Sequence, residues 1–218
     1  PDLAKNLHHL AKKNRVRILG TGVNPGFLMD TLVTFLTTVC QEVESIVVER
    51  VIDASHRRQA FQRKIGVALT EEEFTSKIEG KEISGHVGLE ESIAMICDTL
   101  GWRLQRIEAE QPKPIIASKQ VSSPYYTVPA GRVIGIQQTA RGYVNGEARI
   151  TLIFKAYIGA EEYDHIHIRG IPEVNQMIKP AIQGDKATAA IVVNSIWPLL
   201  KTKPGLKTMR DLQPLSYK

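Results

Sequence analysis

The sequence predicts an α+β fold in which a mixed, largely antiparallel sheet has helices packed on one face. Three observations support this prediction. Asn145-Gly146 joins two long β-branched runs and is the strongest short signal for a β-hairpin. Before the hairpin, residues 27–40 and 89–100 carry apolar side chains at helical spacing. A helix-like segment and a short β-branched run open the chain at residues 2–19, as at the end of an α/β domain.

The composition is that of a globular protein. The chain has 218 residues, 43% of them hydrophobic, which suits one large domain or one domain with an appended piece. Cys40 and Cys97 lie in apolar helical patterns without C-x-x-C spacing. We therefore expect no metal site, no disulfide and a reducing, cytoplasmic setting. The longest apolar run, Phe27 to Cys40, is too short to cross a bilayer, so we expect no membrane partner.

The net charge of +5 comes from dispersed Lys and Arg residues. Because only 6% of the residues are aromatic, the charge favours an acidic small molecule or a phosphate-bearing cofactor over nucleic acid. The chain begins at Pro1 without an initiator Met, which predicts a fragment of a longer protein.

The first half of the chain predicts alternating strands and helices. A strand at Val16–Leu19 precedes a largely buried helix at Phe27–Cys40 and a strand at Val43–Asp53. Thr70 and Glu73 have the spacing of a capping box, which predicts a short helix after them. Another helix follows at residues 89–100 and ends at a glycine.

The second half predicts mainly strands. The hairpin strands are Arg132–Val144 and Glu147–Gly159, with Arg141 opposite Ile150. This register puts apolar residues on both faces, and one face carries Ile134, Ile136 and Ile153. We expect helices on one face and a second subunit on the other, in a homo-oligomer that is a dimer or tetramer.

The C-terminal quarter predicts two more strands and a helix. The strands are Asp164–Arg169 and Glu173–Ile178, and Asp185 is the expected N-cap of the helix Ala187–Leu200. We expect residues 201–218 to form a tail.

The turn at residues 20–26 is the first candidate for ligand binding. Gly20, Gly22 and Gly26 lie between a strand and a helix, where free backbone N–H groups can meet an anion. Their spacing is one residue longer than that of the dinucleotide-binding fingerprint, with Glu49 near the position of a ribose-binding acid. Pro25 argues against an independent dinucleotide domain because it removes one N–H group.

Three further groups carry candidate chemistry. His56, Arg57 and Arg58, with Lys64 shortly after, follow the predicted strand 43–53, where ligand contacts are common and one arginine can bind a carboxylate. His86 lies between two glycines and titrates near neutral pH. The alternatives are a solvated loop and a structural histidine. The pair His165 and His167 shares one side of a strand but has no third ligand, so we assign no metal.

Four motifs in order are specific for one family: G-T-G-V-N-P-G-F-L-M-D (20–30), D-A-S-H-R-R-Q-A-F-Q-R-K-I-G (53–66), G-H-V-G-L-E-E-S (85–92) and G-D-K-A-T-A-A-I-V-V-N (184–194). They resemble the 2,4-diaminopentanoate dehydrogenase family, which is related to the dihydrodipicolinate reductases. The paired His and the Pro-Ser-Gly-Thr of those reductases are absent here, which argues against their reaction.

The resemblance implies a two-domain oxidoreductase. Residues 1–24 would be the last helix and strand of a truncated nucleotide-binding Rossmann domain, residues 25–200 a substrate-binding and oligomerisation domain, and residues 201–218 a C-terminal tail. The cofactor, NAD or NADP, would be held mainly by upstream residues, with Gly22, Asn24, Pro25 and Gly26 near its nicotinamide end.

The implied reaction is the oxidative deamination of an amino-acid substrate such as 2,4-diaminopentanoate. Arg57 or Arg58 would bind the substrate carboxylate, and His56, Lys64 or His86 would accept the proton of the amine. This part of the protein would be inactive alone. The alternatives are a non-catalytic assembly or small-molecule-binding module and a reductase of a related imino acid.

Overall fold

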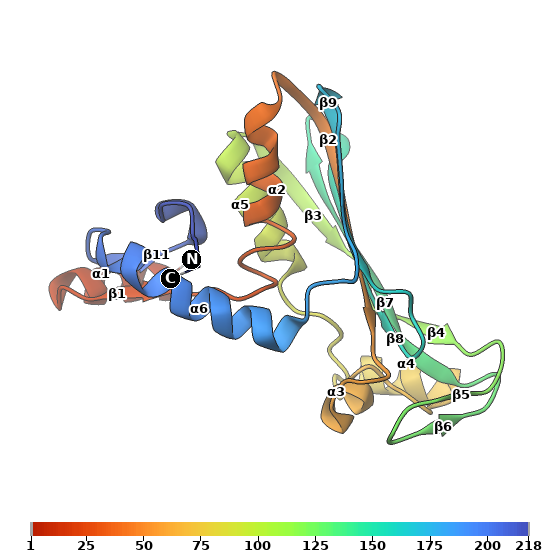
Figure 1. The fold of residues 1–218 in the computed structure, drawn as a ribbon. Coiled ribbons are helices and arrows are strands. Elements are labelled where there is room, and N and C mark those ends of the chain that lie inside the picture. Colours follow the sequence, from red (N-terminus) through yellow and green to blue (C-terminus); the bar gives the residue numbers. More distant parts are fainter. Residues whose placement is uncertain (1, 218) are drawn as a thin grey trace.

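The computed structural model describes residues 2–217, which fold into a large mixed sheet with helices and a smaller unit beside it (Figure 1). In chain order the elements are α1 (Asp2–Lys13), β1 (Arg17–Leu19), α2 (Thr31–Leu36), η1 (Thr37–Val39), β2 (Glu42–Asp53), α3 (Gln59–Lys64), α4 (Glu71–Glu79), α5 (Leu89–Leu100), β3 (Leu104–Ala109), β4 (Lys113–Ile116), β5 (Val121–Ser122), β6 (Thr127–Val128), β7 (Val133–Val144), β8 (Glu147–Tyr157), β9 (Tyr163–Ile171), β10 (Val174–Ile178), α6 (Gly184–Leu200), β11 (Gly205–Lys207) and η2 (Met209–Asp211).

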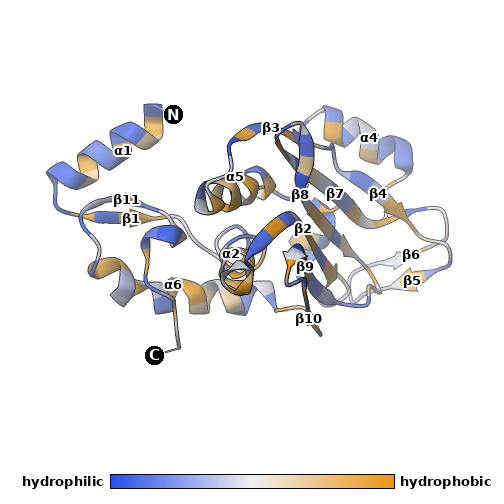
Figure 2. Ribbon diagram, turned by 90° about the horizontal axis from the view of Figure 1, so that it is seen from above, coloured by the Kyte–Doolittle hydropathy of each residue, from blue (hydrophilic) through white to orange (hydrophobic). Residues whose placement is uncertain are grey.

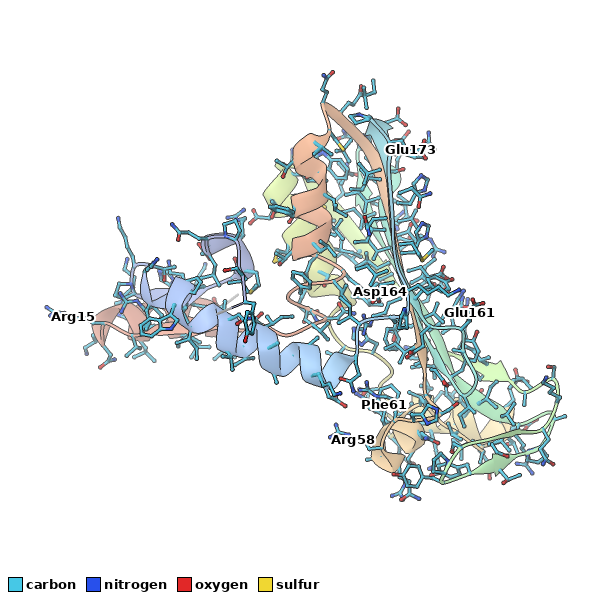
Figure 3. The ribbon with its side chains drawn as sticks, in the orientation of Figure 1. Arg15, Arg58, Phe61, Glu161, Asp164 and Glu173 are labelled. Carbon is cyan, nitrogen blue, oxygen red and sulfur yellow. The ribbon has the colours of Figure 1, made fainter. Side chains whose placement is uncertain are left out.

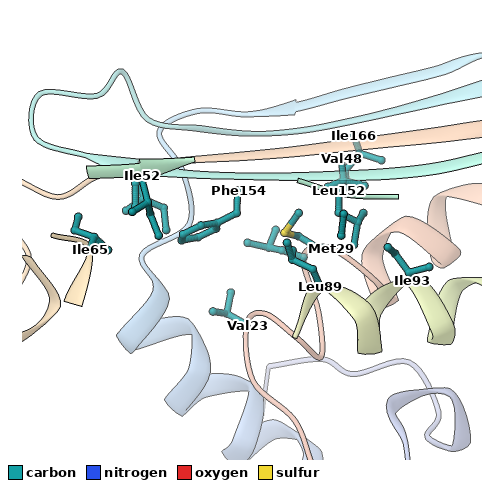
Figure 4. Packing of buried hydrophobic residues seen from close by; sticks show 14 of the residues in the cluster. Val23, Met29, Val48, Ile52, Ile65, Leu89, Ile93, Leu152, Phe154 and Ile166 are labelled. Atoms are coloured by element: carbon teal, nitrogen blue, oxygen red, sulfur yellow. The ribbon is translucent and has the colours of Figure 1, made fainter. Parts of the chain in front are cut away.

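The sheet confirms the predicted fold class. Its order is β10-β9-β2-β8-β7-β3, with β4 also paired to β7. Only β2 and β8 run parallel, and every other pair in it is antiparallel. Helices α2 and α5 cover one face, and no helix of the described residues 2–217 lies on the other (Figure 1). Figure 4 shows Met29, Leu89 and Ile93 packed on the side of the sheet that carries Leu152 and Phe154.

The β7–β8 hairpin is confirmed, but its predicted register is wrong beyond the turn. Asn145 and Gly146 both have positive φ, 52° and 81°, as a two-residue turn of this hand requires. A β-bulge after Gly142 then shifts the pairing, so Arg141 lies opposite Thr151 instead of Ile150.

The bulge changes which side chains share a face. The residues of β7 that share the helix-covered face with Leu152 include Ile136 and Ala140, all three at most 1% exposed. Ile134 is also buried, at 7% exposure. The expected grouping of Ile134 and Ile136 with Ile153 on a subunit-contacting face is therefore wrong, because Ile153 alternates with buried Leu152 and Phe154.

The predicted helix Phe27–Cys40 is shorter than expected. Residues 25–30 form turns, α2 begins at Thr31, and the last turn is the 3₁₀ segment η1. The Thr34 and Thr37 hydroxyls donate to backbone carbonyls three residues earlier, at 2.9 and 2.6 Å, which competes with regular helix geometry. Phe35 and Val39 are 61% and 65% exposed, so this helix is not buried all round.

A smaller unit is formed by both ends of the chain. Strands β1 and β11 pair in parallel, with Ile18 opposite Leu206, beside α1 and α6 (Figure 1). Residues 201–218, expected as a tail, thus include a strand, because the chain after α6 returns to the free edge of β1. The N-cap of α6 is Gln183, whose side chain accepts from the Lys186 N–H, and not Asp185 as predicted. The division of the chain into domains stays a prediction.

Candidate active site

A row of four side chains crosses the helix-covered face of the sheet. The register pairs Gln138 of β7 with Phe154 of β8, Phe154 with Arg50 of β2, and Arg50 with Asp164 of β9. Side chains at directly paired positions share a face, and Phe154, Arg50 and Asp164 are all buried. Sequence reasoning missed this row. Its available signal was Arg50, a charge inside the apolar run 46–52.

His86 lies over this row, in the loop between α4 and α5. Its ring stacks on Phe154, with 4.4 Å between centroids and 20° between planes. Its backbone N–H donates to Gln138 Oε1 at 2.9 Å. Asn24 Nδ2 lies 3.1 Å from His86 Nε2 and 2.8 Å from Met29 Sδ. An amide nitrogen only donates, so with this amide orientation Nε2 is an acceptor and the ring proton sits on Nδ1.

The electrostatic environment keeps the His86 ring neutral. Burial is the largest cause, followed by the positive charges of Lys64 and Arg50, and together they lower the pKa of His86 from 6.5 to about 4. At neutral pH the ring therefore carries an unprotonated nitrogen near two cations, Lys64 and Arg50. A carboxylate arriving beside these cations would weaken their effect and raise the pKa of His86.

The predicted cofactor loop is held in one conformation by a buried carboxylate. Asp30 is 1% exposed and accepts from the Gly26 N–H at 2.8 Å, the Thr31 N–H at 2.5 Å and the Ser92 hydroxyl at 2.7 Å. Gly26 has φ +127°, and a Cβ there would lie 2.6 Å from the Gly22 nitrogen, so the turn requires glycine. The turn is therefore built before any ligand arrives.

This loop lines a cleft of about 780 Å³ between α5 and the smaller unit. All four predicted cofactor residues, Gly22, Asn24, Pro25 and Gly26, line it, so the structure brings them together. Among the described residues that line the cleft, the charged ones are acidic: Asp30, Glu91 and Asp98. Such a lining suits an uncharged or cationic group and does not suit a diphosphate.

The basic segment after β2 is split between interior and solvent. His56, Arg58 and Lys64 are exposed. Figure 3 shows Arg58 and Phe61 close to α3. The side chain of Arg57 is only 15% exposed and donates from Nη2 to Asp185 Oδ1 at 3.1 Å. Its guanidinium also lies 5.0 Å from the centre of the Phe61 ring, and its buried Nε has no partner. Arg57 is thus the half-buried, pre-oriented member of the candidate arginine pair.

Two expectations about absent features concern the described residues 2–217. No helix there is long and apolar enough to cross a membrane. Within the same range, no three His, Cys, Asp or Glu side chains come together to hold a metal ion. His165 and His167 instead make separate bonds, to Asn175 and Glu173.

The comparisons with known proteins agree with these motifs and this architecture. The family of 2,4-diaminopentanoate dehydrogenase C-terminal domains matches residues 27–216. The chain belongs to this family. The family match contains the basic segment, His86 and the α6 motif, and it begins one residue after the glycine turn at residues 20–26.

Two relatives extend the comparison. The 2,4-diaminopentanoate dehydrogenase of Acetoanaerobium sticklandii is 39% identical over an alignment of 217 positions, which covers 97% of this chain and 62% of that protein. The solved amine dehydrogenase from Mycobacterium smegmatis has a TM-score of 0.84 at 19% identity and covers 100% of this chain, which itself covers 65% of that one. This second likeness shows the fold alone. This chain spans less than two thirds of the length of either relative.

Proposed function

We propose that this chain is the substrate-binding and oligomerisation part of an NAD(P)-dependent oxidoreductase that oxidatively deaminates a diamino acid such as 2,4-diaminopentanoate. The observation that carries the proposal is His86, a neutral ring held over Phe154 between the cleft loop and the cations Arg50 and Lys64. A deaminating site needs a proton acceptor beside a cationic pocket for the carboxylate. The family membership supports the substrate class.

The proton acceptor in this proposal is His86. His56 and Lys64, the other two candidates, have exposed side chains in water. The Nε2 of His86 already accepts from the Asn24 amide, and the amine of the substrate would take over this acceptor. Once the carboxylate offsets the nearby positive charges, the ring becomes a better base at the moment the substrate is bound.

The carboxylate would bind to Arg57. Its guanidinium is oriented by Asp185 and Phe61, whereas Arg58 is exposed at the start of α3. Arg50 lies close enough to both His86 and Arg57 for its charge to act on both. This arrangement supports one anion-binding region next to the proton acceptor.

The cleft loop fits the nicotinamide end of the cofactor. None of the described residues that line it is a cation that could hold a diphosphate. Asn24 lines it and has a buried Oδ1 without a partner in residues 2–217, which can accept from a carboxamide N–H. Gly22, Asn24, Pro25 and Gly26 would hold this end, where the bound cofactor accepts a hydride. The choice between NAD and NADP and the phosphate contacts would then belong to residues outside this chain.

The smaller unit would complete the cofactor domain. A parallel sheet of two three-residue strands is short for independent stability. The curated relative is longer than this chain, which covers 62% of it. An upstream segment packed on β1 and on the exposed side of α6 would extend this sheet and bring the rest of the cofactor site with it.

The uncovered face of the sheet is the proposed contact with a second copy. Its charged groups are already paired: Glu49 bonds Lys155 at 2.7 Å and Tyr163 at 2.6 Å, and His167 bonds Glu173. A partner can cover such a face without leaving an unpaired buried charge. Light scattering on the full-length protein and its Ile153→Arg variant tests this contact; a parent that is monomeric removes it.

One experiment tests the proposed function. The full-length protein and the chain of residues 1–218 are supplied with 2,4-diaminopentanoate and either NAD⁺ or NADP⁺, and formation of the reduced cofactor is followed. We expect turnover from the full-length protein and none from the shorter chain. Full-rate turnover by residues 1–218, or no turnover by the full-length protein with either cofactor, would overturn the proposal.

A further inference from the structure

Two chain segments connect the sheet to the smaller unit, and each is anchored on the sheet side by a buried aspartate. The first segment, residues 20–30, is held by Asp30. The second, residues 179–183, joins β10 to α6 and meets Asp164, which is 2% exposed. Figure 3 shows Asp164 where the chain passes from the sheet to α6.

The second anchor is a closed set of three bonds. Arg50 Nη1 lies 2.6 Å from Asp164 Oδ1, and Arg50 Nη2 donates to the Ile182 carbonyl at 2.6 Å. The Ile182 N–H donates in turn to Asp164 Oδ2 at 2.8 Å. The two side chains therefore hold both polar groups of one peptide residue, and they leave that residue little freedom to move on the sheet.

Ile182 is the last residue before the N-cap of α6. Two residues beyond that cap, Asp185 accepts from Arg57, and one turn further the Thr188 hydroxyl accepts from the Val23 N–H at 3.2 Å. The first two turns of α6 thus contact both the carboxylate-binding arginine and the cleft loop. A shift of Ile182 would move both contacts together.

Stability alone is a weak reason for this pair. Burying two charges costs desolvation energy that their attraction offsets only in part, and apolar pairs of similar volume often stabilise a protein equally well. An apolar pair, however, could not form the hydrogen bonds to the N–H and C=O groups of Ile182.

We propose that Arg50 and Asp164 are positioning residues, which fix the first turn of α6 so that Asp185 holds Arg57 in place for the substrate carboxylate. This role rests on the proposed function, because it assigns a carboxylate to Arg57. It deepens that function by making recognition of the carboxylate depend on a clamp that acts on Arg57 through α6.

The test uses the double variant Arg50→Met with Asp164→Leu in the full-length protein. Replacing both charges together leaves no unpaired buried charge, so the variant is expected to fold, which a circular dichroism melt checks. The matched control is Glu44→Gln with Arg169→Gln, which removes an exposed ion pair between the same two strands, β2 and β9. Single variants of Arg50 or Asp164 are avoided because each strands one buried charge.

Two readouts separate a positioning role from a merely structural one. Amide hydrogen exchange in residues 182–188 should become about tenfold faster in the clamp variant and stay unchanged in the control. The KM for 2,4-diaminopentanoate should rise about tenfold or more, and this rise should exceed any change in kcat that follows from removing the Arg50 charge near His86. Unchanged exchange in residues 182–188, or an unchanged KM together with a reduced kcat, would overturn the proposal.

The two readouts also keep this inference distinct from the proposed function. A parent enzyme without turnover refutes the proposed function, and the exchange measurement then still decides whether the clamp holds α6. An active parent whose clamp variant shows parental exchange refutes the clamp alone. If the clamp variant fails to melt cooperatively, Arg50→Leu with Asp164→Leu, a second apolar pair that cannot bond Ile182, replaces it in both measurements.

Discussion

The sheet and the smaller unit of this chain differ in how well each buries its own apolar surface. The sheet has strands of up to 12 residues and a continuous core against α2 and α5. The smaller unit has a pair of three-residue strands, and α6 exposes a set of large apolar side chains: Val192, Val193, Ile196, Trp197 and Leu200. Figure 2 shows this apolar character along the α6 ribbon. The difference indicates that the sheet buries a core against α2 and α5, whereas α6 has an open apolar side.

The largest expected effect separates the two regions directly. Leu152→Ala, in the sheet core at 0% exposure, should lower the free energy of unfolding of this chain by about 3 to 4 kcal/mol. Val193→Ala, on α6 at 59% exposure, should change it by less than about 0.5 kcal/mol. Urea denaturation gives both values. Equal losses would mean that α6 is as well packed as the sheet, contrary to the comparison.

The second prediction concerns what covers α6. Trp197→Ala should cost less than about 0.5 kcal/mol in residues 1–218, because the side chain is 61% exposed there. In the full-length protein the same change should cost about 2 kcal/mol or more, since an upstream segment would bury it. The matched control is Tyr125→Ala, at 50% exposure in the turn between β5 and β6, which should cost equally little in both lengths. A Trp197 effect that is equally small in both would remove the proposed docking of the upstream segment.

The third prediction uses the half-buried ring of His86. Its folded pKa of about 4 lies below the 6.5 of the free side chain, so the unfolded chain binds the extra proton first as pH falls. Stability is therefore fully present above about pH 6.5 and is lost as the pH falls toward 4. Between pH 7 and pH 5 we expect a loss of about 2 kcal/mol from this group. The loss should shrink by that amount in His86→Gln, and an identical pH dependence in both proteins would contradict a neutral ring.

The smallest expected effect is local to α4. Thr70 and Glu73 form a reciprocal capping box, with bonds of 3.0 and 2.8 Å. Thr70→Ala should cost about 1 kcal/mol and leave hydrogen exchange in the cleft loop 20–26 unchanged. A Thr70→Ser control keeps the acceptor and should restore most of the loss. A change of hydrogen exchange in the cleft loop would mean that α4 and the smaller unit are coupled. The two regions would then be less independent than the comparison states.

The sequence predicted most elements of the sheet but not the way its residues come together. Asn145-Gly146 predicted the hairpin because a two-residue turn of this kind requires positive φ at both of its residues. The bulge after Gly142 was not predicted, since no local signal marks an extra residue in a strand. It moved Ile134 and Ile136 to the opposite face from the one expected. The pairing of β11 with β1 was also missed, because a three-residue strand has too little pattern to distinguish it from a tail.

The candidate site shows the same limit. Local motifs identified His86, Arg57 and the glycine loop, whose residue types and turns are recognisable in a short window. The row that supports His86 combines β2 with the much later strands β7, β8 and β9, and only their register brings Gln138, Phe154 and Arg50 together. Burial also distinguished Arg57 from Arg58 and His86 from His56, which residue type could not.

The most direct test of the account is the kinetics of His86→Gln in the full-length protein. The substitution keeps a polar side chain of similar size and removes the titrating ring. With 2,4-diaminopentanoate as substrate, we predict that kcat falls by about 100-fold or more while KM changes by less than about threefold, because the lost group acts on the proton and not on the carboxylate. A variant that retains the parental kcat would contradict the assignment of His86 as the proton acceptor.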